Sequence, residues 1–338
     1  MDINWKELGF AYVKTDKRFV SNYKGGAWDE GVMTDDETIA INECACVLQY
    51  AQTCFEGLKA YETVDGKAVC FRPDLNAERM VQSCERLRMP VFPKERFLQA
   101  VIETVRANRQ WVPPYGTDAS LYLRPFMFGS DAIIGVKPAT EYQFRIFATP
   151  VGPYFKGGVR PLSVRISDLD RAAPRGTGNI KAGLNYAMSL YNIVDAHEHG
   201  FDENIYLDPQ THTYIEETGG ANVLFVTRDN KVVTPKSDSI LPSITRRSLV
   251  QVARDYLGLE VEERRIALDE VKDFAECGLC GTAAVISPVG KIVTHDGEIT
   301  FPSGMNEMGP VTKKLYETLR RIQLGTLHAP EGWIVQID

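Results

Sequence analysis

Short apolar runs separated by turn residues predict a strand-rich beginning of the chain. A run that alternates apolar and polar residues fits a half-buried strand, and Asp65-Gly66 between two such runs is the clearest hairpin turn. Helical spacing of apolar residues then predicts one helix from Pro73 to before Pro90 and another from Lys94 to Asn108. The strands expected in this region are 12–13, 38–41, 45–50, 58–61, 68–71, 121–128 and 141–148. Residues 1–152 are therefore expected to form a small α/β domain.

A Gly-containing stretch separates this region from a second one with a different order of elements. Residues 153–160 are the expected linker, and residues 161–338 the expected second domain. Two domains also suit the length, because 338 residues exceed one small core. The strands expected in the second domain are one from Ser163 and those at 204–207, 212–215, 223–226, 231–233, 260–263 and 283–286, and the helices are one after Lys181 and those at 245–257 and 310–324.

Composition and charge exclude several classes of partner. The net charge is -7, and no long Lys/Arg run occurs, which argues against nucleic acids and anionic membranes. No window approaches the roughly 18 apolar residues of a membrane span. The first eight residues resemble neither a signal peptide nor a transit peptide. We therefore expect a cytoplasmic protein with neither nucleic-acid nor membrane partners.

Seven cysteines are scattered over the chain, an odd number that is typical of reduced thiols packed as small apolar residues. Cys277 and Cys280 have C-x-x-C spacing, but no second pair or His cluster completes a zinc site. A redox pair and two buried thiols without a function are both open interpretations, and no metal site is predicted.

The most informative chemistry lies between Arg175 and Tyr186, where three glycines and a threonine surround Lys181. Such a density of Gly marks a place where the backbone bends unusually or comes close to a ligand. A lysine that loses hydration there becomes a nucleophilic amine that can form a Schiff base with an aldehyde cofactor. A solvated lysine on a flexible loop is the alternative. The helix expected after it carries its apolar residues at Leu184, Met188, Tyr191 and Val194.

Three further segments could complete a site around such a lysine. Glu217 shares a strand side with Ile215, so it is expected to be buried while Glu216 is exposed. A buried carboxylate needs a partner, such as a protonated ring nitrogen, although an edge glutamate paired with a lysine also fits. The helix start near Thr245 suits a phosphate, and the small residues at 281–284 let the backbone approach a ligand.

Tyr122 and Arg124 lie two residues apart on one face of a predicted strand. An aromatic wall beside a guanidinium suits a substrate that has an apolar side chain and a carboxylate. An amphipathic edge strand without a binding role explains the same pattern.

Taken in order, these segments resemble the class IV pyridoxal-phosphate aminotransferases, specifically the branched-chain amino-acid aminotransferases of the longer, eukaryote-like type. The resemblance extends from Phe10 to about Pro288. It implies an α+β, two-domain fold-type IV enzyme, with a small N-terminal α/β domain and a larger domain built on a mixed, barrel-like sheet. The motifs that carry it are Tyr50…Phe55-Glu-Gly57, Phe71-Arg-Pro…Asn76-Ala-Glu-Arg79, Leu121-Tyr-Leu-Arg-Pro125, Gly178-Asn-Ile-Lys181…Asn185-Tyr186, Glu217-Thr-Gly…Asn222, Leu241-Pro-Ser-Ile-Thr245-Arg246 and Gly281-Thr282-Ala283.

The resemblance implies roles for particular residues toward the cofactor, pyridoxal 5′-phosphate. Lys181 would hold it as a Schiff base and shuttle the proton, Glu217 would keep its ring nitrogen protonated, and Tyr186 would donate to its phenolic oxygen. The other residues implied at the cofactor are Arg79, Ile244, Thr245 and Thr282 at the phosphate and Leu241 on the ring face.

A substrate pocket and a dimer are also implied. Arg124 would receive the distal carboxylate of glutamate, and the turn at Thr282-Ala283 the α-carboxylate. The family is generally homodimeric with shared active sites, and Ile134-Gly-Val136 matches its crossing loop. The residues implied to contact the apolar side chain of the substrate are Phe10, Tyr50, Tyr122 and Tyr154.

The implied activity is reversible amino transfer between L-leucine, L-isoleucine or L-valine and 2-oxoglutarate by a ping-pong mechanism. A D-amino-acid aminotransferase or an aminodeoxychorismate lyase of the same fold is the alternative, and a non-catalytic binding protein is a more distant one. The mammalian mitochondrial members carry a redox C-x-x-C just after the Gly-Thr-Ala turn. Ala284 and Ser287 occupy those positions here, so that switch is not carried over to this chain.

Overall fold

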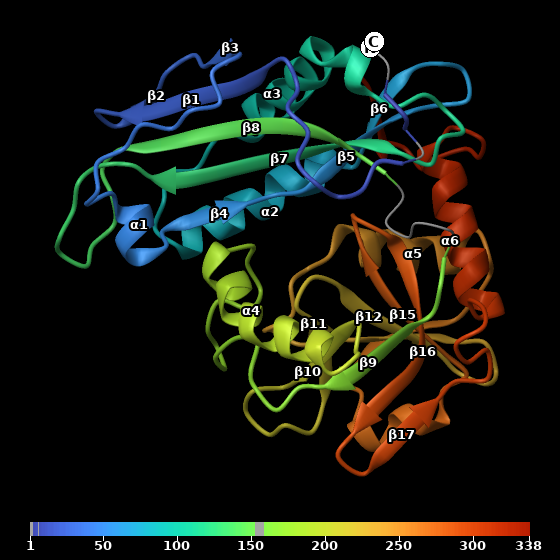
Figure 1. Ribbon diagram of the computed structural model, residues 1–338. Helices are drawn as coiled ribbons and strands as arrows, with labels where there is room; N and C mark the ends of the chain where they lie inside the picture. Colours follow the sequence, from blue (N-terminus) through green and yellow to red (C-terminus); the bar gives the residue numbers. More distant parts are fainter. Residues whose placement is uncertain (1–2, 6, 153–158) are drawn as a thin grey trace. The chain divides into compact units, whose positions relative to one another are not determined.

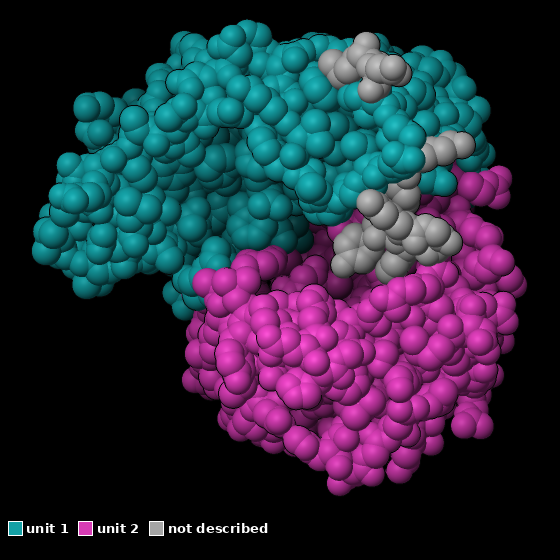
Figure 2. Space-filling model, viewed as in Figure 1, with its two compact units in different colours: residues 1–154, 180–184, 322–338 teal, residues 155–179, 185–321 magenta. Residues whose placement is uncertain are grey.

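The computed structural model describes residues 3–5, 7–152 and 159–338. They cluster into two compact units (Figure 2). Unit 1 lies within residues 1–154, together with 180–184 and 322–338, and unit 2 within residues 155–179 and 185–321. Most of the expected linker, residues 153–158, lies outside the described residues. Among the helices that are described, none combines the length and the apolar character that crossing a membrane requires.

Unit 1 is built on an antiparallel sheet with helices on one face (Figure 1). The strands follow the order β18-β6-β5-β7-β8-β1-β2, with β3 paired to β1 and β4 paired to β7. The strands are β1 (Arg18–Lys24), β2 (Ala27–Trp28), β3 (Val32–Thr34), β4 (Thr53–Phe55), β5 (Leu58–Glu62), β6 (Ala68–Phe71), β7 (Ser120–Gly129), β8 (Tyr142–Val151) and β18 (Ile334–Gln336), and the helices are α1 (Cys46–Tyr50), α2 (Pro73–Arg86) and α3 (Lys94–Ala107) with a short 3-10 turn at Arg109–Trp111.

The two faces of this sheet carry different kinds of residue. Leu123 and Met127 of β7 and Phe144 of β8 belong to the apolar core that includes α2 and α3. Since side chains alternate along a strand, the residues between them point to the opposite face. That face of β7 carries Tyr122 and Arg124, two of the residues expected to contact the substrate.

The end of the chain completes the sheet of unit 1. Ile334 of β18 pairs with Phe71 of β6. The Asp338 carboxylate accepts a hydrogen bond from the Ala68 N–H at 2.8 Å, and the Ile337 carbonyl accepts one from Arg106 Nε at 2.8 Å. The sequence placed residues 161–338 together, whereas residues 322–338 cluster with the first 154. A three-residue strand has too little pattern to reveal its distant partner.

Unit 2 contains a ring of strands. Following the pairs from β11 through β10, β9, β16, β15 and β12 leads back to β11, and β13, β14 and β17 extend the sheet. This ring is the barrel-like core of the expected fold class, which is confirmed. The elements are β9 (Leu162–Ile166), β10 (Glu203–Leu207), β11 (Ile215–Thr218), β12 (Asn222–Val226), β13 (Val232–Pro235), β14 (Val261–Arg264), β15 (Glu276–Gly281), β16 (Val285–Thr294) and β17 (Gly297–Thr300), with α4 (Gly183–Glu198), α5 (Ile244–Asp255), α6 (Pro310–Gln323) and a 3-10 segment at Leu268–Asp273.

Several expected strands are wrong. Of the run 45–50, residues 46–50 form α1 instead of a strand, and neither 12–13 nor 38–41 is a strand. The first of these is a short apolar run, and such a run fits a buried helical turn as well as a strand. Strands β1 to β3 were not expected, because their alternation is weak. Of the run 212–215 only Ile215 is in β11, since the Asp208 carboxylate holds the N–H groups of Thr213 and Tyr214 in a turn.

Helix α4 buries its polar side and exposes its apolar side, the reverse of an ordinary surface helix. Its buried side consists of Asn185, Ser189, Asn192 and Ala196. The apolar stripe that predicted the helix points outward, and Met188, Tyr191 and Val194 are 50%, 69% and 53% exposed. Helical spacing therefore identified the helix but not the side that faces the core. An exposed apolar stripe of this kind marks a contact surface.

Candidate active site

Lys181 is anchored in unit 1 by its own backbone. Its N–H donates to Ser83 Oγ of α2 at 3.1 Å, and its carbonyl accepts from the Phe55 N–H of β4 at 3.0 Å. Ala182 forms a bridge with Cys54 of the same strand. The Lys181 ammonium lies 4.8 Å from the centre of the Phe55 ring. The lysine is therefore fixed between a helix and a strand, in contrast to the alternative of a flexible loop.

The Phe55 ring also brings a predicted substrate residue close to the lysine. The Arg124 guanidinium lies 4.7 Å from the centre of the same ring, and its Nη2 donates to the Tyr122 hydroxyl at 3.0 Å. Phe10, which is 48% exposed, contacts the Tyr122 ring edge-on at 5.5 Å. Unit 1 thus gathers an amine, a guanidinium and an aromatic wall on one face.

Gly57 makes room for the Tyr122 hydroxyl. A Cβ atom added at Gly57 would lie 2.2 Å from this oxygen, so Gly57→Ala must displace the tyrosine and its bond with Arg124. For the amino transfer that the sequence resemblance implies, we expect the KM for the amino donor and for 2-oxoglutarate to rise about tenfold, the loss that one charge-assisted hydrogen bond carries. The cofactor content should stay unchanged. Steady-state kinetics with absorbance of the bound cofactor check this. The clash should also lower the melting temperature of Gly57→Ala, and adding Tyr122→Phe should relieve the clash and restore that temperature.

Arg79, the expected phosphate residue of unit 1, is held by a buried acid that was not expected at the site. Its Nε and Nη2 donate to the two oxygens of Glu56 at 2.8 and 2.7 Å. Asn76 Nδ2 donates to the same carboxylate at 2.7 Å. Glu56 is fully buried, so this bidentate pair fixes the guanidinium plane. The Phe55-Glu-Gly57 motif could have identified Glu56, because Glu56 is the central residue of a motif on which the resemblance rests.

Of the two other predicted pocket residues, the structure describes only Tyr50, which contacts the predicted crossing loop. Tyr50 ends α1 and is 38% exposed, and its hydroxyl donates to the Ile134 carbonyl. In the predicted crossing loop, the Ile134 side chain is 76% exposed and the Val136 side chain is 87% exposed. Tyr154 lies outside the described residues.

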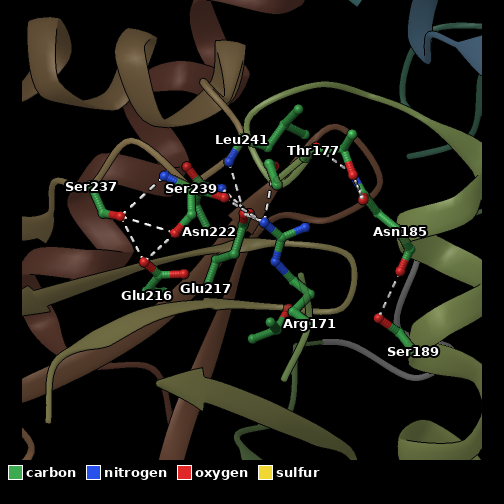
Figure 3. A network of polar contacts seen from close by, with 12 residues as sticks. Arg171, Thr177, Asn185, Ser189, Glu216, Glu217, Asn222, Ser237, Ser239 and Leu241 are labelled. Carbon is green, nitrogen blue, oxygen red and sulfur yellow. Dashed lines mark hydrogen bonds and ion pairs between the residues drawn. The ribbon is translucent and has the colours of Figure 1, made fainter. Parts of the chain in front are cut away.

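In unit 2, Glu217 is the centre of a polar network (Figure 3). It is 3% exposed. Its Oε1 accepts from the Leu241 N–H and pairs with Arg171 Nη2, both at 2.7 Å, and its Oε2 accepts from Asn222 Nδ2 at 2.8 Å. Two predicted residues, Glu217 and Leu241, thus meet, and burial of the acid fits the expectation. Arg171 was missed because no local pattern connects it to a strand more than forty residues later.

The neighbouring acid, Glu216, corrects one expectation. It was expected to be exposed, but it is 4% exposed and accepts from Ser237 Oγ at 2.6 Å and from the Ser239 hydroxyl. Alternation holds, since Glu216 shares none of the hydrogen-bond and ion-pair partners of Glu217 (Figure 3). The expectation failed because both sides of this strand are covered.

The N-terminus of α5 has the geometry of an anion site. Ser243 caps the helix by accepting from the Arg246 N–H at 3.2 Å, and Ile244 and Thr245 are both 6% exposed. A helix leaves its first N–H groups without partners inside the helix, and its dipole is positive at this end. The predicted phosphate residues Ile244 and Thr245 therefore present suitable donors.

Thr282 and Ala283 lie in the turn between β15 and β16, both partly exposed. The turn closes at Val285, which has a φ of 65°. A β-branched residue with positive φ is strained, and such strain is typical of functional turns. Tyr186, five residues after Lys181, is half-buried on α4. The neighbouring Asn185 is fixed because Thr177 Oγ1 donates to its Oδ1 at 2.7 Å.

The C-x-x-C pair cannot form a disulfide within this fold. Cys277 and Cys280 are both on β15, three positions apart. They therefore point to opposite faces, with Cα atoms about 10 Å apart, and a disulfide needs less than about 7 Å. Burial raises the pKa of both thiols, that of Cys280 to about 12. Of the two interpretations left open, buried thiols fit the geometry.

Glu203 at the start of β10 makes stability depend on pH. Burial raises the pKa of its carboxyl from 4.5 to about 7. Between these values the unfolded chain loses its proton while the folded protein keeps it, so stability falls as the pH rises. We expect a loss on the order of 2–3 kcal/mol between about pH 5 and pH 8 that Glu203→Gln abolishes. Urea unfolding at both pH values measures it, with the exposed Glu260→Gln as control; identical pH profiles for Glu203→Gln and the unaltered protein would contradict the assignment.

Known proteins place this arrangement in a family. The model of the family Amino-transferase class IV matches residues 53–292. The branched-chain-amino-acid aminotransferase of Haemophilus influenzae is 51% identical, with 100% of this chain and 99% of that protein covered, and that of Helicobacter pylori is 48% identical, with 99% and 98% covered. The crystal structure of the Escherichia coli branched-chain amino acid aminotransferase matches with a TM-score of 0.80 and 28% identity, covering 96% of this chain and 100% of that one.

A solved structure in the PLP form is similar as well. The branched-chain amino acid aminotransferase of Thermobaculum terrenum in its PLP form matches with a TM-score of 0.78 and 26% identity, covering 96% of this chain and 100% of that one. Both the sequence relatives and the solved structures agree with the family model. The chain therefore belongs to the class IV aminotransferases, within the branched-chain amino-acid aminotransferase family.

Proposed function

We propose that this chain transfers the amino group reversibly between L-leucine, L-isoleucine or L-valine and 2-oxoglutarate. The names of its relatives, at up to 51% identity among those described, support the substrate class. The structural observation that carries the proposal is the buried Glu217 with its guanidinium and N–H partners, because a buried acid in such a setting suits a cationic ring nitrogen.

The residues of unit 2 fit pyridoxal 5′-phosphate. Asn222 Oδ1, beside Glu217, is a buried acceptor without a hydrogen-bond partner among the described residues, which marks a place for a polar ligand atom or water. The start of α5 would receive the phosphate on the N–H groups of Ile244 and Thr245, next to the Thr282 hydroxyl. When bound, the cofactor supplies an electron-poor ring that withdraws electron density from the carbon that loses its proton.

The residues of the chain would bind and orient the cofactor and would move the proton. Lys181 would anchor the cofactor through its amine and then carry the proton between the two carbons of the exchange. Glu217 would keep the ring nitrogen protonated, and Arg171 and Asn222 would hold Glu217 in place. Tyr186 would donate to the phenolic oxygen, Leu241 would pack on the ring, and Arg79 would add a charge at the phosphate.

The substrate would be oriented from unit 1. Arg124, seated on Phe55 and bonded to Tyr122, has the bidentate geometry that suits the distal carboxylate of glutamate. The Phe10 and Tyr122 rings offer an apolar wall to leucine, isoleucine or valine. One pocket would thus accept both an apolar side chain and a charged one, as the exchange requires.

A homodimer completes the proposal. The outward apolar stripe of α4 and the open Ile134 and Val136 are the surfaces that a second subunit would cover. Shared active sites would follow if this loop reached the partner's pocket, and Tyr50 is already bonded to it. Light scattering of the purified protein measures its oligomeric state, and a monomer at micromolar concentration would contradict the proposal.

Reduced cysteines and the absence of a basic run suit a cytoplasmic enzyme, which cell fractionation tests.

An amino-donor panel tests the activity. With 2-oxoglutarate as acceptor, L-leucine, L-isoleucine and L-valine should be used and D-alanine ignored. Use of D-alanine with no use of L-leucine would favour a D-amino-acid aminotransferase instead. Release of pyruvate and an aromatic product from aminodeoxychorismate would indicate the lyase.

A further inference from the structure

A second cavity opens on the sheet face of unit 1 that carries Tyr122 and Arg124. Its volume is about 360 Å³, and its walls include Tyr12, Phe126 and Phe147. Phe147 meets the Tyr12 and Phe126 rings edge-on at 5.9 and 6.0 Å. None of the residues that the proposed transaminase uses lines it. Its volume lies at the lower end of the roughly 300–1,000 Å³ of small-molecule sites.

Two buried arginines line this apolar cavity. Arg18 of β1 and Arg145 of β8 are 3% and 7% exposed. Within the described residues, neither guanidinium forms an ion pair with a carboxylate. Buried charges are ordinarily paired, because desolvating an unpaired one is costly. Two such charges at one cavity therefore call for an anion.

The hydrogen bonds of these arginines go to neutral oxygens and supply no negative charge. Arg145 donates to the Thr38 and Asp36 carbonyls and to Gln143 Oε1 at 3.3–3.4 Å, beyond the usual 2.7–3.2 Å. Arg18 donates to the Asp35 and Thr15 carbonyls at 2.5 and 3.3 Å. Burial lowers the pKa of Arg145, and the charge of Arg18 lowers it further against the opposing effect of Asp36. Both side chains are positioned by uncharged oxygens, and the Asp36 carboxylate acts on both from a distance without forming an ion pair among the described residues.

The one carboxylate at the cavity is already engaged. Glu37 accepts from Lys14 Nζ and from the Tyr12 hydroxyl, each at 3.0 Å. Among the residues that line the cavity, two arginines stand against one carboxylate, so the lining itself is net positive. Ile39 and Ile146 complete the apolar lining.

We propose that this cavity binds an organic monocarboxylate with an apolar body, with its carboxylate on Arg18 and Arg145 and its body against the aromatic walls. This is the chemical class of the branched 2-oxo acids that the proposed reaction produces. None of the residues proposed for the reaction lines this cavity, so a ligand bound there would not be transaminated. A guanidinium pair binds a carboxylate strongly where water is excluded.

The probe is 4-methylpentanoate, which has neither an amino nor an oxo group and cannot be transaminated. Titration calorimetry of the holoenzyme should find two saturable sites per chain, one of them at the reaction centre. Ile39→Trp should fill the second cavity and remove one site while turnover is retained. Val64→Trp is the matched control, because Val64 is an exposed apolar residue of the same unit that does not line the cavity.

Charge and shape are then tested separately. Arg145→Gln should weaken the second site about tenfold or more, as should replacing the probe by the neutral 4-methylpentan-1-ol. Inorganic phosphate should not compete, because it lacks an apolar body. A single site in the unaltered protein, identical isotherms for Ile39→Trp and Val64→Trp, or full displacement by phosphate would each overturn the proposal. Binding is the readout, so a failure here leaves the transaminase proposal untouched.

Discussion

Lys181→Ala is expected to lower the rate of amino transfer by ~10³-fold or more. The variant loses both the amine that anchors the cofactor and the group that carries the proton. The fold should survive, because Lys181 is held through its backbone N–H and carbonyl, which alanine keeps. Turnover with L-leucine and 2-oxoglutarate measures the loss, and mass spectrometry after borohydride treatment should find the cofactor bound to the unaltered chain and not to the variant.

Lys314→Ala is the matched control, since this exposed lysine on α6 lies outside the proposed site. It should retain full turnover and the covalent adduct. A Lys181→Ala protein that keeps more than a tenth of the activity, or an adduct at another lysine, would remove the basis of the proposed mechanism.

Glu217→Gln should slow turnover by ~10²–10³-fold at saturating cofactor, the range for loss of one preorganised electrostatic group. Glutamine keeps the size of the side chain but cannot hold a protonated ring nitrogen. It also leaves the Arg171 guanidinium buried without its counter-charge, which should lower the free energy of unfolding by roughly 3 kcal/mol. Steady-state kinetics and urea unfolding of the holoenzyme separate the two effects.

Glu216→Gln is a close control for this variant. Glu216 is equally buried, but its partners are the serines 237 and 239 on the other side of β11. It should lose stability and keep its turnover. Equal losses of turnover in both variants would mean that Glu217 acts through the fold instead of through the cofactor.

Elements with a strong period were predictable from the sequence. Helices α2 and α3 begin and end close to where the Pro73 and Lys94 patterns placed them, and the Asp65-Gly66 hairpin is confirmed. These elements bury one face, so their apolar residues in the sequence are also the residues that face the core. The pattern misled where the environment differed, as on α4, whose polar side is buried.

The candidate site was predictable only in its motif residues. Local sequence singled out Lys181 and Glu217 as candidates because glycines and a β-period surround them. It did not reveal Arg171 or Glu56, which hold predicted residues from distant parts of the chain. Contacts of this kind depend on the fold, and no spacing rule encodes them. Glu216 was misjudged for the same reason, since its exposure depends on a loop that comes after β13.

The pairing of β18 with β6 has a consequence for synthesis on the ribosome. The edge of β6 is covered by residues 334–336, which are synthesised long after β6, so a nascent chain exposes this edge until they have emerged. An uncovered strand edge invites pairing with other chains. Residues 180–184 also belong with the first unit, so its packing too waits for the middle of the chain. The N-terminal unit therefore cannot complete its sheet until residues 334–336 have left the ribosome.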